Sequence, residues 1–433
     1  LHVLALDSLP VTGTGKVQRR VLAEQFALRK VTDPQPPPRS EDEIEDVKSL
    51  FQFEFPGQDV GDHDTFETLG GDSLHYIQFS LAFESHFGQL PDQWEKLTVA
   101  ELQQQVQVTD KSTWRRLESV TLTRAFFMIC IIALHTNAFV YSANWCAAYF
   151  LMMLAGYSVA RFQLPEIIRS GSVRTLWGTI RFVAVPTILM DALLEMVTRN
   201  FELPSLLLVS NYQDPSAIRG YTFYFVEFYL QLLVLSAILF SFERVREAFR
   251  QRPILSAVVL FLVVVAIDRT VESIWNGDYN YHRTPWHYGW CFALGIIMAS
   301  AKDLKTRLFA FALAIVCSLL VWQLTSAAFY VIGGSAIVLF VRSIVVPAPA
   351  KVVIAEIAGA SMFVYLSHFQ IISLVEKSFG KPHPWLELTL SIFVGIGVAR
   401  FYIGLERKIL RLGNPRRMPE SLGPQTLMNS RTN

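Results

Sequence analysis

Long apolar runs dominate the chain from about residue 118 onward, whereas the sequence before that point is polar, with apolar residues at helical spacing. A helix of about 20 apolar residues crosses a hydrocarbon core roughly 30 Å thick. Ten runs reach or approach this length, and we predict ten crossings with a margin of one or two. They cover approximately residues 121–141, 144–162, 176–197, 221–242, 253–268, 286–301, 308–324, 327–346, 352–375 and 385–405.

Basic residues concentrate in alternate connections between these runs. Cytoplasmic loops retain Lys and Arg preferentially, and an even number of crossings puts both ends of the chain on one side. We therefore predict an integral protein of the bacterial cytoplasmic membrane with both termini in the cytoplasm and residues 407–433 as a basic tail. The basic side carries Lys111, Arg115, Arg116, Arg161, Arg169, Arg174, Arg244, Arg246, Arg250, Arg252, Lys302, Lys305, Arg307, Arg407, Lys408, Arg411, Arg416 and Arg417.

Composition supports a membrane protein and excludes several other classes. Of the 433 residues, 52% are hydrophobic and 17% are charged, which is unusual for a soluble enzyme. The net charge of +1 provides no basic field, so we expect no nucleic-acid partner. The four cysteines stand alone in apolar runs without the spacing of metal ligands, so we expect packing roles and no metal site.

Two polar segments precede the apolar region, separated by the proline-rich linker Asp33-Pro-Gln-Pro-Pro-Pro38. The second segment, residues 40–108, has the length of a small domain. Ser40 with Glu43, and Thr98 with Glu101, each fit the capping box that starts a helix. We therefore predict a small four-helix domain there.

A serine at a predicted helix start is the first candidate for chemistry. In Phe66-Glu-Thr-Leu-Gly-Gly-Asp-Ser-Leu-His75, a glycine pair lets the chain turn, and Asp-Ser then opens an apolar-periodic helix. The free N–H groups and positive dipole of a helix N-terminus favour a phosphate attached to Ser73. The alternative is an ordinary N-cap serine.

Leu69-Gly-Gly-Asp-Ser-Leu74 resembles the phosphopantetheine attachment motif of carrier domains in nonribosomal peptide synthetases. The resemblance covers roughly residues 40–108. It implies a covalent 4'-phosphopantetheine on Ser73 as the cofactor and a phosphopantetheinyl transferase as a partner.

The first 33 residues carry a weaker signal. Leu9-Pro-Val-Thr-Gly-Thr-Gly-Lys16 is a glycine-rich loop that presents one lysine, and it resembles the last motif of adenylate-forming enzymes. The resemblance implies that residues 1–33 are the C-terminal tail of an adenylation domain, a short α/β fragment, with Lys16 as the adenylation lysine. Because the nucleotide-binding body is absent, we expect adenylation only from a longer parent; the alternative is an inactive remnant.

Two ionisable residues share the first apolar run, where charge is costly and therefore informative. Arg124 and His135 are eleven residues apart, about three helical turns, which places both on one face and roughly 16 Å apart. Histidine suits the removal of a hydroxyl proton, and arginine suits an anionic or carbonyl group of an acyl donor. The alternative is a histidine that only bonds a neighbouring helix.

The arginine, ten residues and a histidine resemble the membrane acyltransferase 3 family, which acylates carbohydrates and other hydroxyl-bearing acceptors. The resemblance spans residues 113–406 and implies His135 and Arg124 as catalytic residues. Ala125 and Ala155 depart from its pattern. The resemblance also rests on Phe150-Leu-Met-Met-Leu-Ala-Gly-Tyr157, Arg174, Arg181, Pro186 and Ser361-Met-Phe-Val-Tyr-Leu-Ser-His368.

Ser361, Tyr365 and His368 also share a helix face by spacing alone, so we predict that they bind substrate. Arg181 and Glu227 lie well inside their apolar runs and are further candidates for donor or acceptor binding.

The expected fold is mainly α: a multi-pass membrane bundle of about ten spans, preceded by the carrier domain and the α/β fragment. The expected function is transfer of an acyl or aminoacyl group from a Ser73 thioester to a hydroxyl or amine of a carbohydrate, lipid or natural product. Three alternatives remain: an acyl-CoA-dependent enzyme with a vestigial carrier domain, a transporter, and a non-catalytic membrane anchor.

Overall fold

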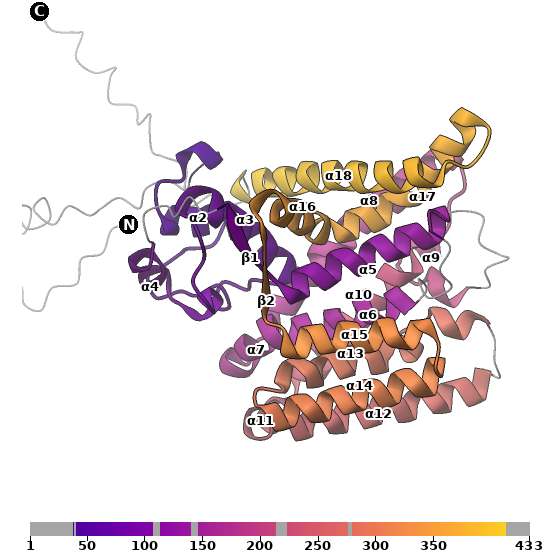
Figure 1. Cartoon of the computed structure of the whole chain (residues 1–433), viewed down its shortest axis with the longest axis horizontal. Helices are drawn as coiled ribbons and strands as arrows, with labels where there is room; N and C mark the ends of the chain where they lie inside the picture. The colour runs from indigo at the N-terminus through magenta and orange to yellow at the C-terminus, as the bar shows by residue number, and fades with distance from the viewer. Residues whose placement is uncertain are drawn as a thin grey trace, which may run out of the picture.

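The computed structural model describes residue 38 and residues 40–106, 113–139, 146–213, 223–275 and 279–412. Residues 40–106 form a small helical unit, called here the N-terminal unit. Residues 113–412 form a long helical bundle, and the N-terminal unit sits against one end of it (Figure 1). Lys16 and the predicted adenylation tail lie outside the described residues.

The N-terminal unit contains three α-helices where four were expected. These are α2 (Val47–Glu54), α3 (Ser73–Phe87) and α4 (Val99–Gln104), with single 3-10 turns η1 (Glu41–Glu43) and η2 (Trp94–Lys96). The predicted capping box of Thr98 and Glu101 is confirmed at α4. The one at Ser40 is wrong, because η1 ends after three residues; Asp46 and Ser49 form the capping box of α2 instead.

Aromatic rings fill the core of the N-terminal unit and shape the loop before Ser73. Trp94 stacks on Phe79 at 4.6 Å between ring centroids and meets the edge of Phe66 at 4.9 Å. A Cβ atom on Gly71 would lie 2.3 Å from the Phe66 ring. The second glycine of the motif is therefore required by core packing, and Gly70 beside it adopts φ +78°, which favours glycine.

The bundle consists of helices of very different lengths and one short antiparallel ribbon. In chain order its elements are β1 (Trp114–Glu118), α5 (Ser119–Thr136), α6 (Ala147–Ser158), the π-helical turn η4 (Val159–Gln163), α7 (Leu164–Ser170), α8 (Arg174–Thr198), α9 (Leu203–Leu206), η5 (Ser210–Tyr212), α10 (Tyr224–Ser241), α11 (Glu243–Gln251), α12 (Pro253–Trp275), η7 (Tyr279–Arg283), α13 (Pro285–Ser300), α14 (Leu304–Trp322), α15 (Ser326–Phe340), β2 (Ser343–Pro347), α16 (Ala348–Gly359), α17 (Ser361–Phe379) and α18 (Pro384–Leu412).

Every predicted apolar run contains helix, but fewer helices than ten meet the requirements for crossing a membrane. By length and composition, α5, α10, α12, α14 and α18 qualify among the described residues. The predicted run 352–375 is broken between α16 and α17, which are bent by 76° and would count as a sixth span if taken together. The end of run 327–346 is strand β2 rather than helix. The structure therefore supports an integral membrane protein, and ten spans remain a prediction.

The ribbon of β1 and β2 was not expected from the sequence. The two strands are antiparallel, with Trp114 opposite Pro347 and Glu118 opposite Ser343. Since β1 leads into α5 and β2 leads into α16, the ribbon fixes the starts of both helices beside the N-terminal unit (Figure 1).

Helices α6 and α13 pack with their backbones in direct contact. A Cβ atom on Gly295 would lie 1.9 Å from the carbonyl oxygen of Met153, and one on Gly156 would lie 1.9 Å from that of Phe292. Small residues let membrane helices approach this closely, so these two glycines set the centre of the bundle.

The end of the bundle that holds the N-terminal unit also holds α7, α11 and the end of α18 (Figure 1). Arg250 of α11 donates a hydrogen bond to the carbonyl oxygen of Ile168 in α7. The connection that contains α7 and the one that contains α11 were both predicted to lie on the basic side, and they meet at one end of the bundle. Residues 407–412 continue α18 as helix, so Arg407 is part of the bundle rather than of a separate tail.

Candidate functional site

Ser73 is the first residue of α3 and does not cap it. Asp72 is the N-cap: its Oδ1 accepts hydrogen bonds from the backbone N–H groups of Leu74 and His75, both at 3.0 Å. The capping interpretation of Ser73 is therefore wrong. Within the described part of the chain the Ser73 hydroxyl forms no hydrogen bond, which leaves its oxygen free for modification.

Asp72 also ties the N-terminal unit to the bundle. Its Oδ2 accepts a hydrogen bond from Thr179 Oγ1 of α8 at 3.0 Å, and its Oδ1 lies 2.9 Å from His75 Nδ1. Although burial opposes ionisation of both groups, the charge and hydrogen bonds of His75 hold the pKa of Asp72 well below its usual value, and Asp72 raises the pKa of His75. A largely buried ion pair thus stands next to Ser73 at the contact with α8.

Ser73 faces a cavity of about 100 Å³ that reaches into the bundle. Five helices of the bundle contribute to its walls together with the start of α3. The lining consists of Ser73, Leu74, Arg124, Met128, Leu151, Met152, Ala155, Val183, Phe225, Val226, Tyr229, Ser361, Met362 and Tyr365. The structure therefore brings together four residues singled out in distant parts of the sequence: Ser73, Arg124, Ser361 and Tyr365.

Arg124 is the one cation on the cavity wall within the described residues. It is 8% exposed, and its Nη2 donates to Ser158 Oγ at 3.0 Å, with no carboxylate in ion-pair contact in that part of the chain. Because no described carboxylate forms an ion pair with this buried cation, the site favours an anionic or strongly polar ligand. Ala155, a departure from the acyltransferase 3 pattern, also lines the cavity. Ser158, one helical turn later, supplies the hydroxyl that contacts Arg124.

His135, further along α5, forms a hydrogen-bonded pair with His368 of α17. His135 Nδ1 lies 2.8 Å from His368 Nε2, and His368 Nδ1 lies 2.5 Å from the carbonyl oxygen of Tyr365. Because a carbonyl only accepts, His368 Nδ1 carries a proton and its Nε2 accepts one from His135 Nδ1. His135 Nε2 is then left with a lone pair, as a general base requires.

Tyr365 connects the cavity to the histidine pair. Its side chain lines the cavity, and its ring centroid lies 5.4 Å from that of His368. Arg124 and His135 are eleven residues apart on α5, roughly 16 Å along the axis. His135 and His368 do not line the cavity, so Ser73 with Arg124 and the histidine pair are two groups, with Tyr365 between them.

Two predicted residues lie away from this site. Arg181 is exposed, and its Nη2 lies 3.3 Å from Glu406 Oε1 of α18. Glu227 is fully buried, and its carboxylate accepts hydrogen bonds from Ser210 Oγ at 2.5 Å and Asn211 N at 2.7 Å, so it ties α10 to η5. Neither residue lines the cavity.

Three contributors were not predicted: Ser158, Thr179 and Tyr229. None of them stands in a motif, and helix packing brings Ser158 to Arg124, Thr179 to Asp72 and Tyr229 to the cavity wall. No group of three or more His, Cys, Asp or Glu side chains in the described ranges is arranged to hold a metal ion.

Comparison with known proteins identifies the family of the bundle. The profile of the acyltransferase 3 family, described as an acyltransferase domain, matches residues 117–403. Over 80 residues the chain is 36% identical to a subunit of the plipastatin synthase of Bacillus subtilis (strain 168), a match that covers 18% of this chain and 3% of that protein. No solved structure matches the chain.

The family profile begins inside β1, ends inside α18 and includes Arg124, His135, Ser361, Tyr365 and His368. It covers more than half of the chain, and the long apolar helices within it are those of an integral membrane protein. The chain therefore belongs to the acyltransferase 3 family of membrane acyltransferases.

Proposed function

We propose that this protein transfers an acyl or aminoacyl group from a phosphopantetheine thioester on Ser73 to a hydroxyl or amine of a carbohydrate, lipid or natural-product acceptor. The observation that carries the proposal is the shared cavity: Ser73 of the N-terminal unit and Arg124, Ser361 and Tyr365 of the acyltransferase bundle line the same space. The resemblance of Leu69-Gly-Gly-Asp-Ser-Leu74 to a carrier motif and the 80-residue similarity to a plipastatin synthase subunit add support for a carrier domain.

The residues at this site suit a phosphopantetheine arm. Within the described residues the Ser73 hydroxyl forms no hydrogen bond, and Arg124, on the wall of the same cavity, forms no ion pair. When bound, the group supplies a thiol that carries the acyl chain as a thioester. Arg124 would hold the anionic or polar part of the arm, while Met128, Met152 and Phe225 exclude water around it.

His135 would act as the general base on the acceptor. Its Nε2 would take the proton of the attacking hydroxyl or amine and would later return it to the thiol, the leaving group of the thioester that supplies the acyl group. His368 positions this base, because its Nε2 accepts from His135 Nδ1 and keeps His135 in the required tautomer.

We also propose that the protein works as part of a larger assembly. Residues 1–33 would be the tail of an adenylation domain that a longer parent supplies, and a phosphopantetheinyl transferase would modify Ser73. We place the N-terminal unit in the cytoplasm, where both enzymes work, and the bundle in the bacterial cytoplasmic membrane.

Intact mass tests the carrier assignment. Protein coexpressed with a broad phosphopantetheinyl transferase should gain one phosphopantetheine, and Ser73→Ala should abolish both the gain and transfer from a loaded acyl group. Ser85→Ala, an exposed serine on the same helix, should behave as wild type. A folded wild-type protein that gains no mass would exclude the carrier and point to free acyl-CoA as the donor.

Replacing Arg124 should slow acyl transfer without affecting phosphopantetheine attachment. Arg124→Gln should leave the mass gain at Ser73 intact but slow transfer roughly 10- to 150-fold, since a hydrogen bond to a charged group is worth about 1.5–3 kcal/mol. Arg124→Lys should retain more activity, because it keeps the charge. Arg181→Gln is the matched control, as Arg181 is an exposed arginine outside the cavity. Equal transfer rates for Arg124→Gln and Arg181→Gln would contradict the assigned role.

A further inference from the structure

Opposite charges face each other where the N-terminal unit meets the bundle. In each ion pair that joins described residues of the two parts, the carboxylate belongs to the N-terminal unit and the cation to the bundle; Arg161 also pairs with Glu118 of β1 at 3.0 Å. The pairs between the two parts, called here the ion-pair interface, are Glu84 with Lys351 at 2.6 Å, Glu54 with Arg407 at 2.5 Å, Glu95 with Arg161 at 2.9 Å, and Asp92 with Arg116 at 3.4 Å and Arg342 at 3.7 Å.

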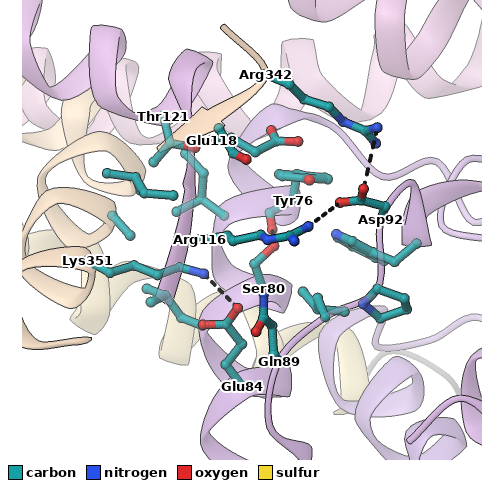
Figure 2. Close-up of a pocket in the computed structure, with 18 of the residues that line it drawn as sticks. Tyr76, Ser80, Glu84, Gln89, Asp92, Arg116, Glu118, Thr121, Arg342 and Lys351 are labelled. Atoms are coloured by element: carbon teal, nitrogen blue, oxygen red, sulfur yellow. Dashed lines mark hydrogen bonds and ion pairs between the residues drawn. The ribbon is translucent and has the colours of Figure 1, made fainter. Parts of the chain in front are cut away.

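The pairs differ in exposure. The side chains of Lys351 and Glu84 are 10% and 11% exposed, whereas those of Arg116 and Asp92 are 58% and 62% exposed. Figure 2 shows Lys351 reaching Glu84 while Arg116 and Arg342 both point to Asp92. Lys351–Glu84, Arg407–Glu54 and Arg161–Glu95 are thus the largely buried pairs, and the Asp92 pairs form a solvent-screened rim.

Apolar residues of the bundle join the core of the N-terminal unit under the ion pairs. Phe162 of η4 packs against Tyr76 at 5.1 Å and Phe66 at 6.1 Å between ring centroids. The same buried cluster includes Ala125, Ala355, Ile357 and Ala358, with Ile129, Ile354, Ile392 and Ile396 packed against it. A contact built from ion pairs and an apolar patch resembles domain interfaces that open and close.

The surface around Ser73 is covered while this interface is formed. Asp72 is bound by Thr179, a Cβ atom on Gly70 would lie 3.4 Å from Thr175 Cγ2, and the His75 ring lies 5.9 Å from that of Phe182. All three contacts are with α8. An enzyme that modifies or loads Ser73 must contact the start of α3, and α8 occupies that place.

We propose that the ion-pair interface docks the N-terminal unit reversibly: docked, Ser73 faces the acyltransferase cavity; released, Ser73 is accessible to the enzymes that modify and reload it. This inference rests on the proposed function, because a carrier must be reloaded after each transfer. The bundle therefore recognises its own carrier by charge, and the docked state competes with the loading enzymes.

Charge reversal across the Glu84–Lys351 pair tests reversible docking. The full chain, purified without phosphopantetheine, is treated with coenzyme A and a phosphopantetheinyl transferase, and attachment is followed by intact mass. Glu84→Lys and Lys351→Glu should each raise the attachment rate several-fold and lower acyl transfer. The exchanged pair, Glu84→Lys with Lys351→Glu, should return both rates toward wild type.

Lys48→Glu is the matched control, since Lys48 pairs with Asp62 inside the N-terminal unit and should leave the attachment rate unchanged. Raising the NaCl concentration should also accelerate attachment to wild type, a readout that needs no variant. Attachment rates that are equal in wild type, both reversals and high salt would overturn reversible docking while leaving the carrier assignment intact. Absence of attachment in every protein, including the reversals, would instead reject the proposed function itself.

Discussion

Replacing His135 with alanine should slow acyl transfer by about 10²–10⁴-fold, the usual contribution of a positioned general base, while phosphopantetheine attachment to Ser73 stays at the wild-type level. The expectation follows from the hydrogen-bond chain: the Tyr365 carbonyl fixes the proton on His368, which in turn fixes the proton on His135 Nδ1. Only His135 Nε2 is left to take a proton from the acceptor. The measurement is single-turnover transfer from preloaded protein, separate from loading.

His368 provides a second variant for the same chain of hydrogen bonds. His368→Gln retains an oxygen that can accept a hydrogen bond from His135 Nδ1, so it should keep more activity than His368→Ala. The two variants should also differ in how the transfer rate depends on pH. His86→Ala, a histidine of the N-terminal unit, is the matched control and should transfer normally. A folded His135→Ala protein that loads and transfers at the wild-type rate would contradict the role of His135 as the general base.

Gly295→Ala should destabilise the bundle more than any exposed substitution of the same type. A single methyl group placed 1.9 Å from the Met153 carbonyl oxygen forces α6 and α13 apart, and overpacking of this kind costs about 1–3 kcal/mol or more. The measurement is the midpoint temperature at which detergent-purified protein loses its monodisperse size-exclusion peak. Transfer should fall too, because α6 carries Ser158 and cavity residues.

Gly397→Ala is the matched control for that change. It introduces the same methyl group into α18, where nothing lies within 4 Å of the added atom. Alanine is also the better helix former, so this variant should be neutral or slightly stabilising. Equal midpoints for Gly295→Ala and Gly397→Ala would mean that the α6–α13 contact is not a fixed feature of the bundle.

Local patterns in the sequence predicted the individual elements well. Apolar runs identified the helices of the bundle, because burial in lipid or protein requires continuous apolar residues and an internally bonded backbone. The Gly-Gly-Asp-Ser motif predicted the start of α3, although the cap is Asp72 and not Ser73. The spacing of Arg124 and His135 predicted one elongated helix face, and the acyltransferase 3 resemblance in residues 113–406 is confirmed by the family match.

The predicted count of ten spans is not confirmed, and there is a physical reason. Hydropathy measures apolar character along the chain, but it does not detect where a helix bends or ends early. The run 352–375 is divided at Ala360, α6 and α13 are short helices whose apolar residues mostly face protein, and α15 has only 15 residues. Arg181 and Glu227 illustrate the same limit: both lie inside apolar runs, yet one pairs with Glu406 at the surface and the other bonds Ser210 and Asn211.

The sequence by itself determined the helical membrane class, the family and the separate candidates Ser73, Arg124, His135, Ser361, Tyr365 and His368, since each depends on residues close together in the chain. Only the tertiary structure decided that Ser73 and Arg124 share one cavity, that His135 bonds His368, and that charges on α16 and α18 meet carboxylates of the N-terminal unit. These contacts join segments far apart in the chain, and they follow from helix packing, which no local pattern encodes.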